Sequence, residues 1–309
     1  MVLAVRPTQE DLISVSGFGS PRCMLFFPAS RPEMYEKAAR SGAHAVCMDL
    51  EDSVAAGGKN AARSFATLAL GRARPNGTDL VIRINHPSTA AGEADLAAIA
   101  GALDAGAPAA RDGGLALMIP KVGAPEEVEA IRGRLSAHDL GVGLIPMIET
   151  VRGLARVEEI AAMESVRALL FGGLDLSIEL GAELAWEPLL YARSRFVHAA
   201  RLAGVGALDM PWLDVSDRTG LEAEARRVRA LGFTGKAAIH PDQVGTVLDA
   251  FSPSEREIAY ARRVVEAAAD APVGAFLLDG AMVDRPVVEA ARRTLERTAD
   301  LSRTRGVGA

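Results

Sequence analysis

Short apolar segments alternate with longer amphipathic segments along most of the chain. Eight runs of six to eight mainly apolar residues begin at positions 23, 45, 80, 115, 142, 168, 205 and 236. Because they are not apolar only at every second position, they are typical of strands buried on both faces of a parallel sheet. The segments between them, such as RPEMYEKAARSG and LEAEARRVRALG, have helical periodicity, and glycines stand where a helix C-cap is expected, at Gly42 and Gly232. Eight βα units in succession predict an α/β fold, a closed (β/α)8 TIM barrel.

The alternation stops near residue 250. After FSPSER the chain has a helical segment at 255–269, a glycine-punctuated segment PVGAFLLDGAMVD and a last helical segment from Pro286. We therefore expect a TIM-barrel catalytic domain at 1–251 and a small helical appendage at 252–309. The appendage is expected either to cap its own barrel or to reach a neighbouring subunit.

Composition and charge narrow the class of protein. The 309 residues include 34 basic and 40 acidic side chains, a formal net charge of −6, without a dense Lys/Arg run. This argues against a general nucleic-acid or anionic-membrane binder. Cys23 and Cys47 lie in apolar runs, which excludes a disulfide framework and a cysteine-rich zinc site and predicts two core residues. No stretch approaches 18 uninterrupted apolar residues and the N-terminus has no long apolar leader, so we expect a cytoplasmic protein.

Polar residues follow seven of the eight predicted strands, at the end where a TIM barrel carries its active site. In chain order they are Asp49, Glu51, Asp52, Arg83, Asn85, Lys121, Glu149, Asp175, Asp209 and His240. This distribution predicts a charged pocket at one mouth of the barrel. His240 precedes a proline and is expected to position its loop.

Glu149 and Asp175 follow adjacent strands, so their carboxylates are expected to converge. Two carboxylates with open coordination positions suit Mg²⁺; the alternative is that each pairs with a basic side chain on the rim. Arg83 ends the third strand, where its guanidinium would bind a substrate carboxylate or a developing enolate. Its alternative role is to neutralise Glu51 or Asp52, and the two roles can coexist.

Three basic residues are candidates for binding a phosphorylated cofactor. Lys59 and Arg63 are four residues apart, on one face of the second helix near the predicted mouth. Together with Arg22, which precedes the first strand, they could contact the phosphates of a nucleotide-like group. The alternative is a solvated basic face.

Several of these segments match a known family. RCMLFFPASRPEMYEKAARSGAHAVCMDLEDSVAAGGKNAAR, PMIETVRGL, FGGLDLSIELG and DGAMVDRP resemble citrate lyase β-subunit-like and malyl-CoA lyase proteins of the HpcH/HpaI aldolase superfamily. The match follows the family's order over nearly the whole chain. The resemblance implies a TIM barrel with a C-terminal appendage that cleaves or forms 3-hydroxyacyl-CoA thioesters with Mg²⁺. Malyl-CoA, citramalyl-CoA and citryl-CoA are the family's usual substrates.

The resemblance also assigns roles to residues. It implies that Glu149 and Asp175 bind Mg²⁺, with Mn²⁺ as a substitute, and that Glu149 borders the substrate. Arg83 falls on the arginine that holds the keto acid and steadies the enolate charge. Asp284 falls on an acidic residue resembling the general acid/base, which the C-terminal segment of an adjacent subunit supplies. A homotrimer or homohexamer is then expected.

The CoA moiety would meet Arg22, Lys59 and Arg63. Two positions depart from the family, because Cys23 replaces a serine near the expected CoA site and His44 replaces an aspartate remote from the chemistry.

The sister branch of aldolases, which acts on free hydroxy-keto acids, carries the pattern D-x-E-H after the second strand. This chain has Asp52 at the place of that histidine, which favours CoA-thioester chemistry. The alternatives are a malyl-CoA-type thioesterase, a metal-dependent aldolase of free 2-keto acids, a partner-dependent subunit like that of citrate lyase, and a non-catalytic CoA-binding module.

Overall fold

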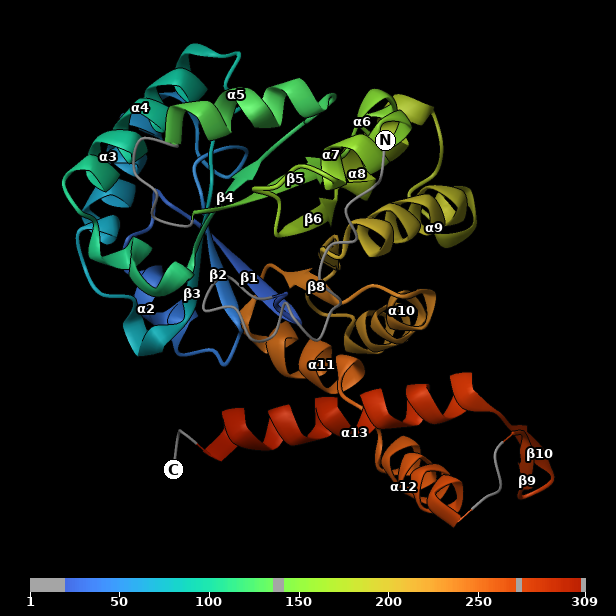
Figure 1. Cartoon of the computed structure of the whole chain (residues 1–309). Helices are drawn as coiled ribbons and strands as arrows, with labels where there is room; N and C mark the ends of the chain where they lie inside the picture. The colour runs from blue at the N-terminus through green and yellow to red at the C-terminus, as the bar shows by residue number, and fades with distance from the viewer. Residues whose placement is uncertain (1–19, 136–141, 271–273, 307–309) are drawn as a thin grey trace. The chain divides into compact units, whose positions relative to one another are not determined.

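The computed structural model describes residues 20–135, 142–270 and 274–306. Its first part is a closed barrel of parallel strands that follow one another in sequence order, with the first strand paired to the eighth (Figure 1). The strands are β1 (Cys23–Pro28), β2 (Ala45–Asp49), β3 (Asp79–Arg83), β4 (Leu115–Ile119), β5 (Gly143–Ile148), β6 (Ala168–Phe171), β7 (Gly206–Asp209) and β8 (Gly235–Ala238). Each begins within one residue of its predicted start, so the predicted TIM barrel is confirmed.

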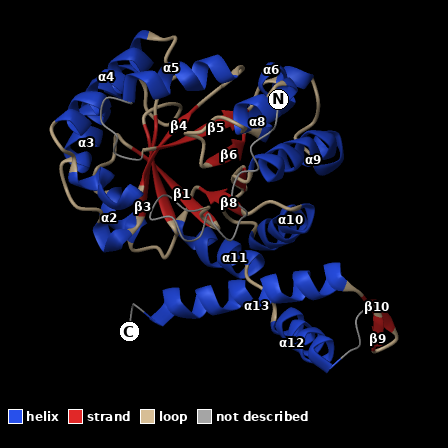
Figure 2. Ribbon diagram, in the orientation of Figure 1, coloured by secondary structure: helices blue, strands red, loops and turns tan. Residues whose placement is uncertain are grey.

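Helices surround the barrel (Figure 2). They are α2 (Met34–Ala39), α3 (Lys59–Leu70), α4 (Ala90–Asp104), α5 (Pro125–Leu135), α6 (Val151–Ala155), α7 (Val157–Ala161), α8 (Gly173–Leu180), α9 (Trp186–Ala203), α10 (Arg218–Leu231) and α11 (Pro241–Phe251). Short 3-10 turns occur at η1 (Ala56–Gly58), η2 (Pro75–Gly77) and η3 (Pro108–Gly113). Helix α10 ends at Gly232, as predicted, where a φ of 112° requires a residue without a Cβ. No helix in the described ranges combines the length and apolarity of a membrane span.

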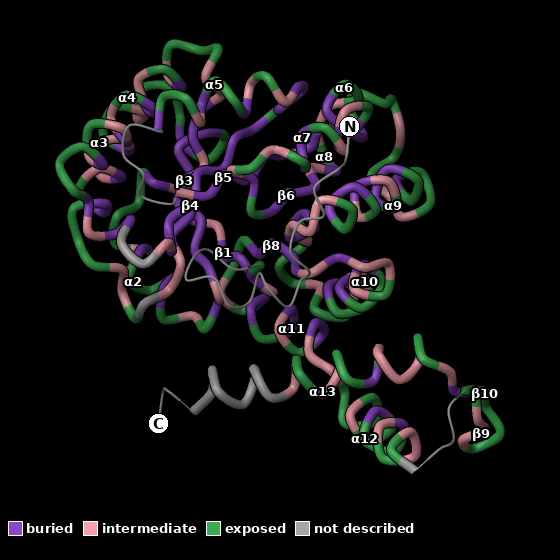
Figure 3. Tube along the Cα trace, viewed as in Figure 1, coloured by how far each residue is buried: buried purple, intermediate pink, exposed green. Residues whose placement is uncertain are grey.

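Alternate strand residues fill the barrel interior, which is buried (Figure 3). They are Met24, Ala45, Cys47, Val81, Ala116, Met118, Ile145, Met147, Ala168, Leu170, Leu208 and Ala237. Both cysteines are buried and unpaired, which confirms them as core residues. Because side chains alternate across a strand, a residue two positions beyond an interior residue points to the same side. Asp49, Arg83 and Glu149 stand in that relation to Cys47, Val81 and Met147.

The chain divides into two compact units between Leu248 and Asp249, whereas the sequence analysis placed the boundary after residue 251. The second unit contains α12 (Glu255–Asp270), an antiparallel hairpin of β9 (Phe276–Leu278) and β10 (Ala281–Val283), and α13 (Arg285–Gly306). Ala261, Val264, Val283 and Ala291 form its own small core. The N-terminal stretch 1–19, expected to lack an apolar leader, lies outside the described residues.

Candidate active site

Strands β2 to β6 and the segments that directly follow them bring seven charged side chains to the C-terminal mouth of the barrel. This group, here called the mouth cluster, consists of Asp49, Glu51, Asp52, Arg83, Lys121, Glu149 and Asp175. Charged side chains therefore gather at this mouth as predicted, although they come from five strands and not from seven.

Arg83 is held by carboxylates on two sides. Its Nε and Nη2 donate to Oδ1 and Oδ2 of Asp49, each at 2.7 Å, which is the two-pronged geometry that suits a guanidinium. Its Nη1 lies 3.0 Å from Oε2 of Glu51 and 3.7 Å from the Asp52 carboxylate. Burial opposes ionisation of Asp49, but the Arg83 guanidinium lowers the Asp49 pKa below its ordinary value. The structure thus gives Arg83 the neutralising role foreseen as an alternative, and adds Asp49 as its main partner.

Glu149 lies between two backbone segments that determine where its carboxylate points. The backbone N–H of Lys121 donates to Oε1 at 2.7 Å. On the other side, a Cβ at Gly172 would collide with the Cβ and Oε2 of Glu149, so only glycine fits beside it. Sequence patterns contain no signal for either contact, because both join neighbouring strands.

Burial, together with the negative charge of Asp175, raises the pKa of Glu149 to about 7, against the lowering effect of the Lys121 N–H. Asp175 lies in the first turn of α8 with a side chain that is 36 % exposed, and its Oδ2 is 3.8 Å from Nζ of Lys121. The structure therefore brings the two predicted metal ligands into electrostatic contact. A bound cation would offset both the burial and the repulsion.

The donor set fits a hard divalent ion. Within the described residues no group of three or more histidine, cysteine or carboxylate side chains forms a ready-made metal site. Two carboxylates are nevertheless enough for Mg²⁺, which keeps several waters or substrate oxygens in its coordination shell. Glu149 and Asp175 would hold the ion and leave its remaining positions open toward the mouth.

Lys59 and Arg63 support the loop after β2. Nζ of Lys59 donates to the carbonyl oxygens of Leu50 at 2.8 Å and Glu51 at 2.5 Å. Nε of Arg63 donates to the buried carboxylate of Asp95 at 2.7 Å. Both predicted phosphate contacts thus have partners within the chain at the same end of the barrel as the mouth cluster.

Arg22 lies at the other end of the barrel. It precedes β1, and its Nη2 is 2.8 Å from Nε2 of His44, whose backbone N–H donates to the carbonyl of Cys23 at the start of the strand. The structure therefore does not bring Arg22 together with Lys59 and Arg63, because residues before and after a barrel strand lie at opposite ends.

Asp209 does not join the mouth, which corrects the sequence analysis. It follows the interior residue Leu208 directly, so its side chain points outward, between the barrel wall and helices α9 and α10. There Asp209 contacts Nζ of Lys236 at 2.5 Å and Nε of Arg193 at 3.3 Å, and Glu224 lies 2.7 Å from the same Nζ. We call Arg193, Asp209, Glu224 and Lys236 the buried quartet. His240 also stays apart, and its Nδ1 accepts the backbone N–H of Asp242, as a loop-positioning role requires.

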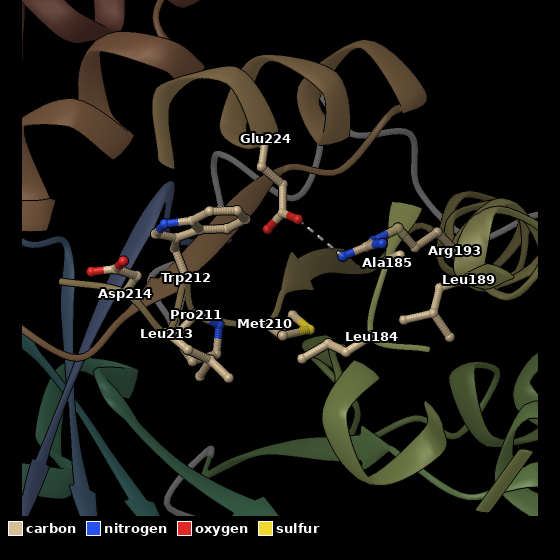
Figure 4. A pocket seen from close by; sticks show the side chains of 10 residues that line it. All are labelled: Leu184, Ala185, Leu189, Arg193, Met210, Pro211, Trp212, Leu213, Asp214 and Glu224. Carbon is tan, nitrogen blue, oxygen red and sulfur yellow. Dashed lines mark ion pairs between the residues drawn. The ribbon is translucent and has the colours of Figure 1, made fainter. Parts of the chain in front are cut away.

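A cavity of about 240 Å³ lies beside the buried quartet (Figure 4). Leu184, Leu189, Met210 and Trp212 contribute apolar walls, and the ion pair of Arg193 and Glu224 closes one side. The sequence analysis missed this cavity, because Arg193 and Glu224 lie within amphipathic helices whose periodicity does not distinguish them from surface charges.

Asp284, the predicted acid/base, belongs to the second unit. It lies between β10 and α13, and its Oδ1 accepts the backbone N–H of Val287 at 3.3 Å, the contact of a helix N-cap. The residue is half-buried.

Comparisons with known proteins agree with this geometry. The sequence model of the family HpcH/HpaI aldolase/citrate lyase matches residues 22–241. The mitochondrial citramalyl-CoA lyase of Homo sapiens is 31 % identical over 295 residues, covering 89 % of this chain and 84 % of that protein. A citrate lyase subunit beta-like protein of Mycobacterium tuberculosis is 36 % identical over 283 residues, covering 89 % of this chain and 95 % of that one.

Solved structures show the same likeness. The protein CitE from Mycobacterium tuberculosis, in complex with magnesium, acetoacetate and coenzyme A, superimposes with a TM-score of 0.77. It is 34 % identical, and the match covers 91 % of this chain and 98 % of that chain. On these grounds the chain belongs to the HpcH/HpaI aldolase/citrate lyase family.

Proposed function

We propose that the chain is a Mg²⁺-dependent carbon–carbon lyase that cleaves or forms a 3-hydroxyacyl-CoA thioester of the malyl-CoA, citramalyl-CoA or citryl-CoA type. The observation that carries this proposal is the pair Glu149 and Asp175, two mutually repelling carboxylates in a mouth with more acids than bases. Relatives that are lyases of this type, and one whose structure contains magnesium and coenzyme A, support it.

In the cleavage direction, the acid half of the substrate would lie at the mouth with its carboxylate and hydroxyl groups toward Glu149 and Asp175. When bound there, Mg²⁺ supplies a Lewis acid that lowers the pKa of the substrate hydroxyl. A base takes the hydroxyl proton and the bond between the carbinol carbon and the thioester α-carbon breaks. Its electron pair moves to the thioester enolate, which is then protonated to acetyl-CoA or a homologue, and a keto acid is released.

Each residue of the mouth has a separate task in this scheme. The guanidinium of Arg83, which Asp49 and Glu51 hold in place, binds the keto acid and stabilises the negative charge that moves onto oxygen. The backbone of Lys121 and the absence of a side chain at Gly172 keep the Glu149 carboxylate aimed at the mouth.

Asp284 is proposed as the proton-transfer group, supplied by the second unit of an adjacent subunit in a homotrimer or homohexamer. Lys59 and Arg63 remain the proposed contacts of the CoA phosphates. Arg22 is removed from that proposal, because it lies at the opposite end of the barrel strands.

The test is a panel of malyl-, methylmalyl-, citramalyl- and citryl-CoA, each with and without Mg²⁺, assayed for lyase and hydrolase products. We expect Mg²⁺-dependent release of a keto acid and an acyl-CoA from one of them. Free CoA and a hydroxy acid as the products would indicate a thioesterase, and turnover of free hydroxy-keto acids alone would indicate an aldolase. Activity only with added acyl-carrier and transferase partners would indicate a citrate lyase β-like subunit, and CoA binding without turnover a regulatory module.

A further inference from the structure

Lys121 has a backbone conformation that is unusual for its residue type. Among the described residues, three that are not glycine have a positive φ: Asn76, Lys121 and Asp279. Asparagine and aspartate tolerate this region, whereas a lysine in it is strained, with a φ here of 52°. Such strain persists only where the surroundings impose it, and it concentrates at functional sites.

The surroundings of Lys121 do impose the conformation. The carbonyl of Val122, the next residue, packs so tightly against α6 that a Cβ at Gly153 would collide with it. The N–H of Gly123 donates to the Glu127 carboxylate at 3.2 Å. This turn aims the Lys121 N–H at Glu149, a task that glycine would perform without strain. The lysine side chain therefore needs an explanation of its own.

That side chain extends into the mouth cluster between two carboxylates. Its Nζ is 3.3 Å from Oε1 of Glu51 and 3.8 Å from Oδ2 of Asp175, so it makes one long hydrogen bond and one looser ion pair. The Lys121 side chain is 46 % exposed, whereas that of Arg83 is 12 % exposed and its Nε, Nη1 and Nη2 all face carboxylates. Of the two cations in the mouth cluster, Lys121 is therefore the more exposed and the less tightly paired.

We propose that Lys121 is a further substrate-binding residue, which pairs with Glu51 and Asp175 in the metal-free mouth and binds an anionic oxygen of the acid half once a divalent ion is present. A divalent cation at Asp175 repels the ammonium, and the flexible four-carbon stem lets the ammonium turn away. The ligand is an anionic oxygen of a 2-keto acid, and the inference rests on the proposed function.

The replacement Lys121→Gly isolates the side chain, because it keeps the N–H that Glu149 accepts and suits the positive φ. Lys121→Arg retains a cation, and Lys121→Asn is a second uncharged variant that tolerates this φ. Asn76→Gly serves as the matched control for relief of backbone strain, since it lies in a turn outside the mouth cluster. The measurements are thermal stability, Mg²⁺ binding by calorimetry, and binding of pyruvate at saturating Mg²⁺.

We expect Lys121→Gly and Lys121→Asn to be at least as stable as the wild-type chain and to bind Mg²⁺ about three- to tenfold more tightly, because a competing cation is gone. Pyruvate binding should weaken by at least about tenfold, a loss of ~1.4 kcal/mol, and Lys121→Arg should restore most of it. Asn76→Gly should change stability alone. In turnover, the loss should appear mainly in KM.

Unchanged Mg²⁺ and pyruvate affinities in both uncharged variants would overturn the inference and leave Lys121 as a rim ion-pair partner. Lower stability with weaker Mg²⁺ binding would overturn it in favour of a structural role. If the wild-type chain binds Mg²⁺ and pyruvate and responds to the substitutions as expected, but turns over no acyl-CoA, the proposed function fails and the inference stands. A wild-type chain that binds no Mg²⁺ would overturn both.

Discussion

The mouth cluster and the buried quartet are both groups of charged side chains that involve barrel strands, yet their charge balance differs. The quartet sets two cations against two carboxylates, and Lys236 and Asp209 are fully buried. The mouth cluster has five carboxylates and two cations, and one of those carboxylates, Glu149, has a pKa raised to about 7. The charges of the quartet therefore balance, whereas the mouth cluster has more carboxylates than cations.

This difference supports our proposal that the quartet is structural and that the mouth cluster binds the metal and the substrate. Charges removed from water must be paired, and a fully paired group has no capacity for a ligand. The quartet instead supports the barrel wall, since Lys236 also donates to the carbonyl of Met210 beyond the end of β7. A surplus of carboxylates persists only where water or a cation reaches it, and this requirement supports the proposal that the mouth cluster is the active site.

The largest effect is expected for Glu149→Ala. Turnover with Mg²⁺ should fall by about 10³-fold or more, because the ion loses its buried ligand. Thermal stability should not fall, because the substitution removes a carboxyl that burial disfavours. Calorimetry of Mg²⁺ binding and a thermal melt check both points; near-native Mg²⁺-dependent turnover would refute Glu149 as a ligand.

The opposite pattern is expected for Lys236→Met. Removing the Lys236 ammonium leaves the buried Asp209 carboxylate with only the 3.3 Å contact to Arg193, so the free energy of unfolding should drop by about 3 kcal/mol or more. Mg²⁺ affinity should stay unchanged. Urea denaturation provides the measurement, and adding Asp209→Leu should recover part of the loss. A Lys236→Met chain with wild-type stability but weakened Mg²⁺ binding would contradict the structural role of the buried quartet.

Asp284→Asn tests whether the mouth is complete without the second unit. It should preserve Mg²⁺ binding and depress turnover by about 10²-fold, as expected for loss of a general acid or base. If Asp284 acts on a neighbouring subunit, Asp284→Asn chains reassembled with Glu149→Ala chains should regain partial activity. Mixed oligomers, verified by mass, that stay as inactive as either parent would argue against action between subunits.

Arg83→Lys should lower kcat/KM by at least about tenfold, ~1.4 kcal/mol of transition-state stabilisation. Lysine keeps the charge but not the planar fork that engages both oxygens of Asp49. Unchanged steady-state kinetics would show that Arg83 serves only as an ion-pair partner.

The smallest effect concerns pH. Because protons and Mg²⁺ compete for Glu149, whose pKa is about 7, Mg²⁺ affinity should rise about tenfold between pH 6 and pH 8 and level off above. Calorimetry in buffers of different ionisation enthalpy would measure the affinity and the proton released. Equal affinities at the two pH values would contradict the raised pKa.

In the metal-free protein, the contribution of Glu149 to folding stability should fall as pH rises, whereas Mg²⁺ affinity should increase. A raised carboxyl pKa means that the folded chain keeps a proton which the unfolded chain has lost. The contribution of Glu149 to stability should therefore decrease as pH rises from about 4.5 to about 7. Glu149→Gln should remove this part of the pH dependence.

Much of the architecture was predictable from the sequence. The continuous apolar runs and their spacing identify the eight strands, because a strand buried on both faces must be apolar whatever its neighbours are. The same runs place Cys23 and Cys47 in the core. Because Glu149 and Asp175 directly follow the fifth and sixth apolar runs, the sequence also predicts these two carboxylates at adjacent strand ends.

The pairing of the charges was decided by the tertiary structure. Asp209 and Glu149 both follow apolar strands, yet a difference of one position in the strand alternation turns Asp209 out to Lys236 and Glu149 in to the mouth. The strain at Lys121 depends on contacts with helices α5 and α6, and the fit of Gly172 depends on the side chain of Glu149 on the neighbouring strand. The periodicity of apolar residues describes one segment at a time. Ion pairing and close side-chain contacts depend instead on distances between segments that are far apart in the chain.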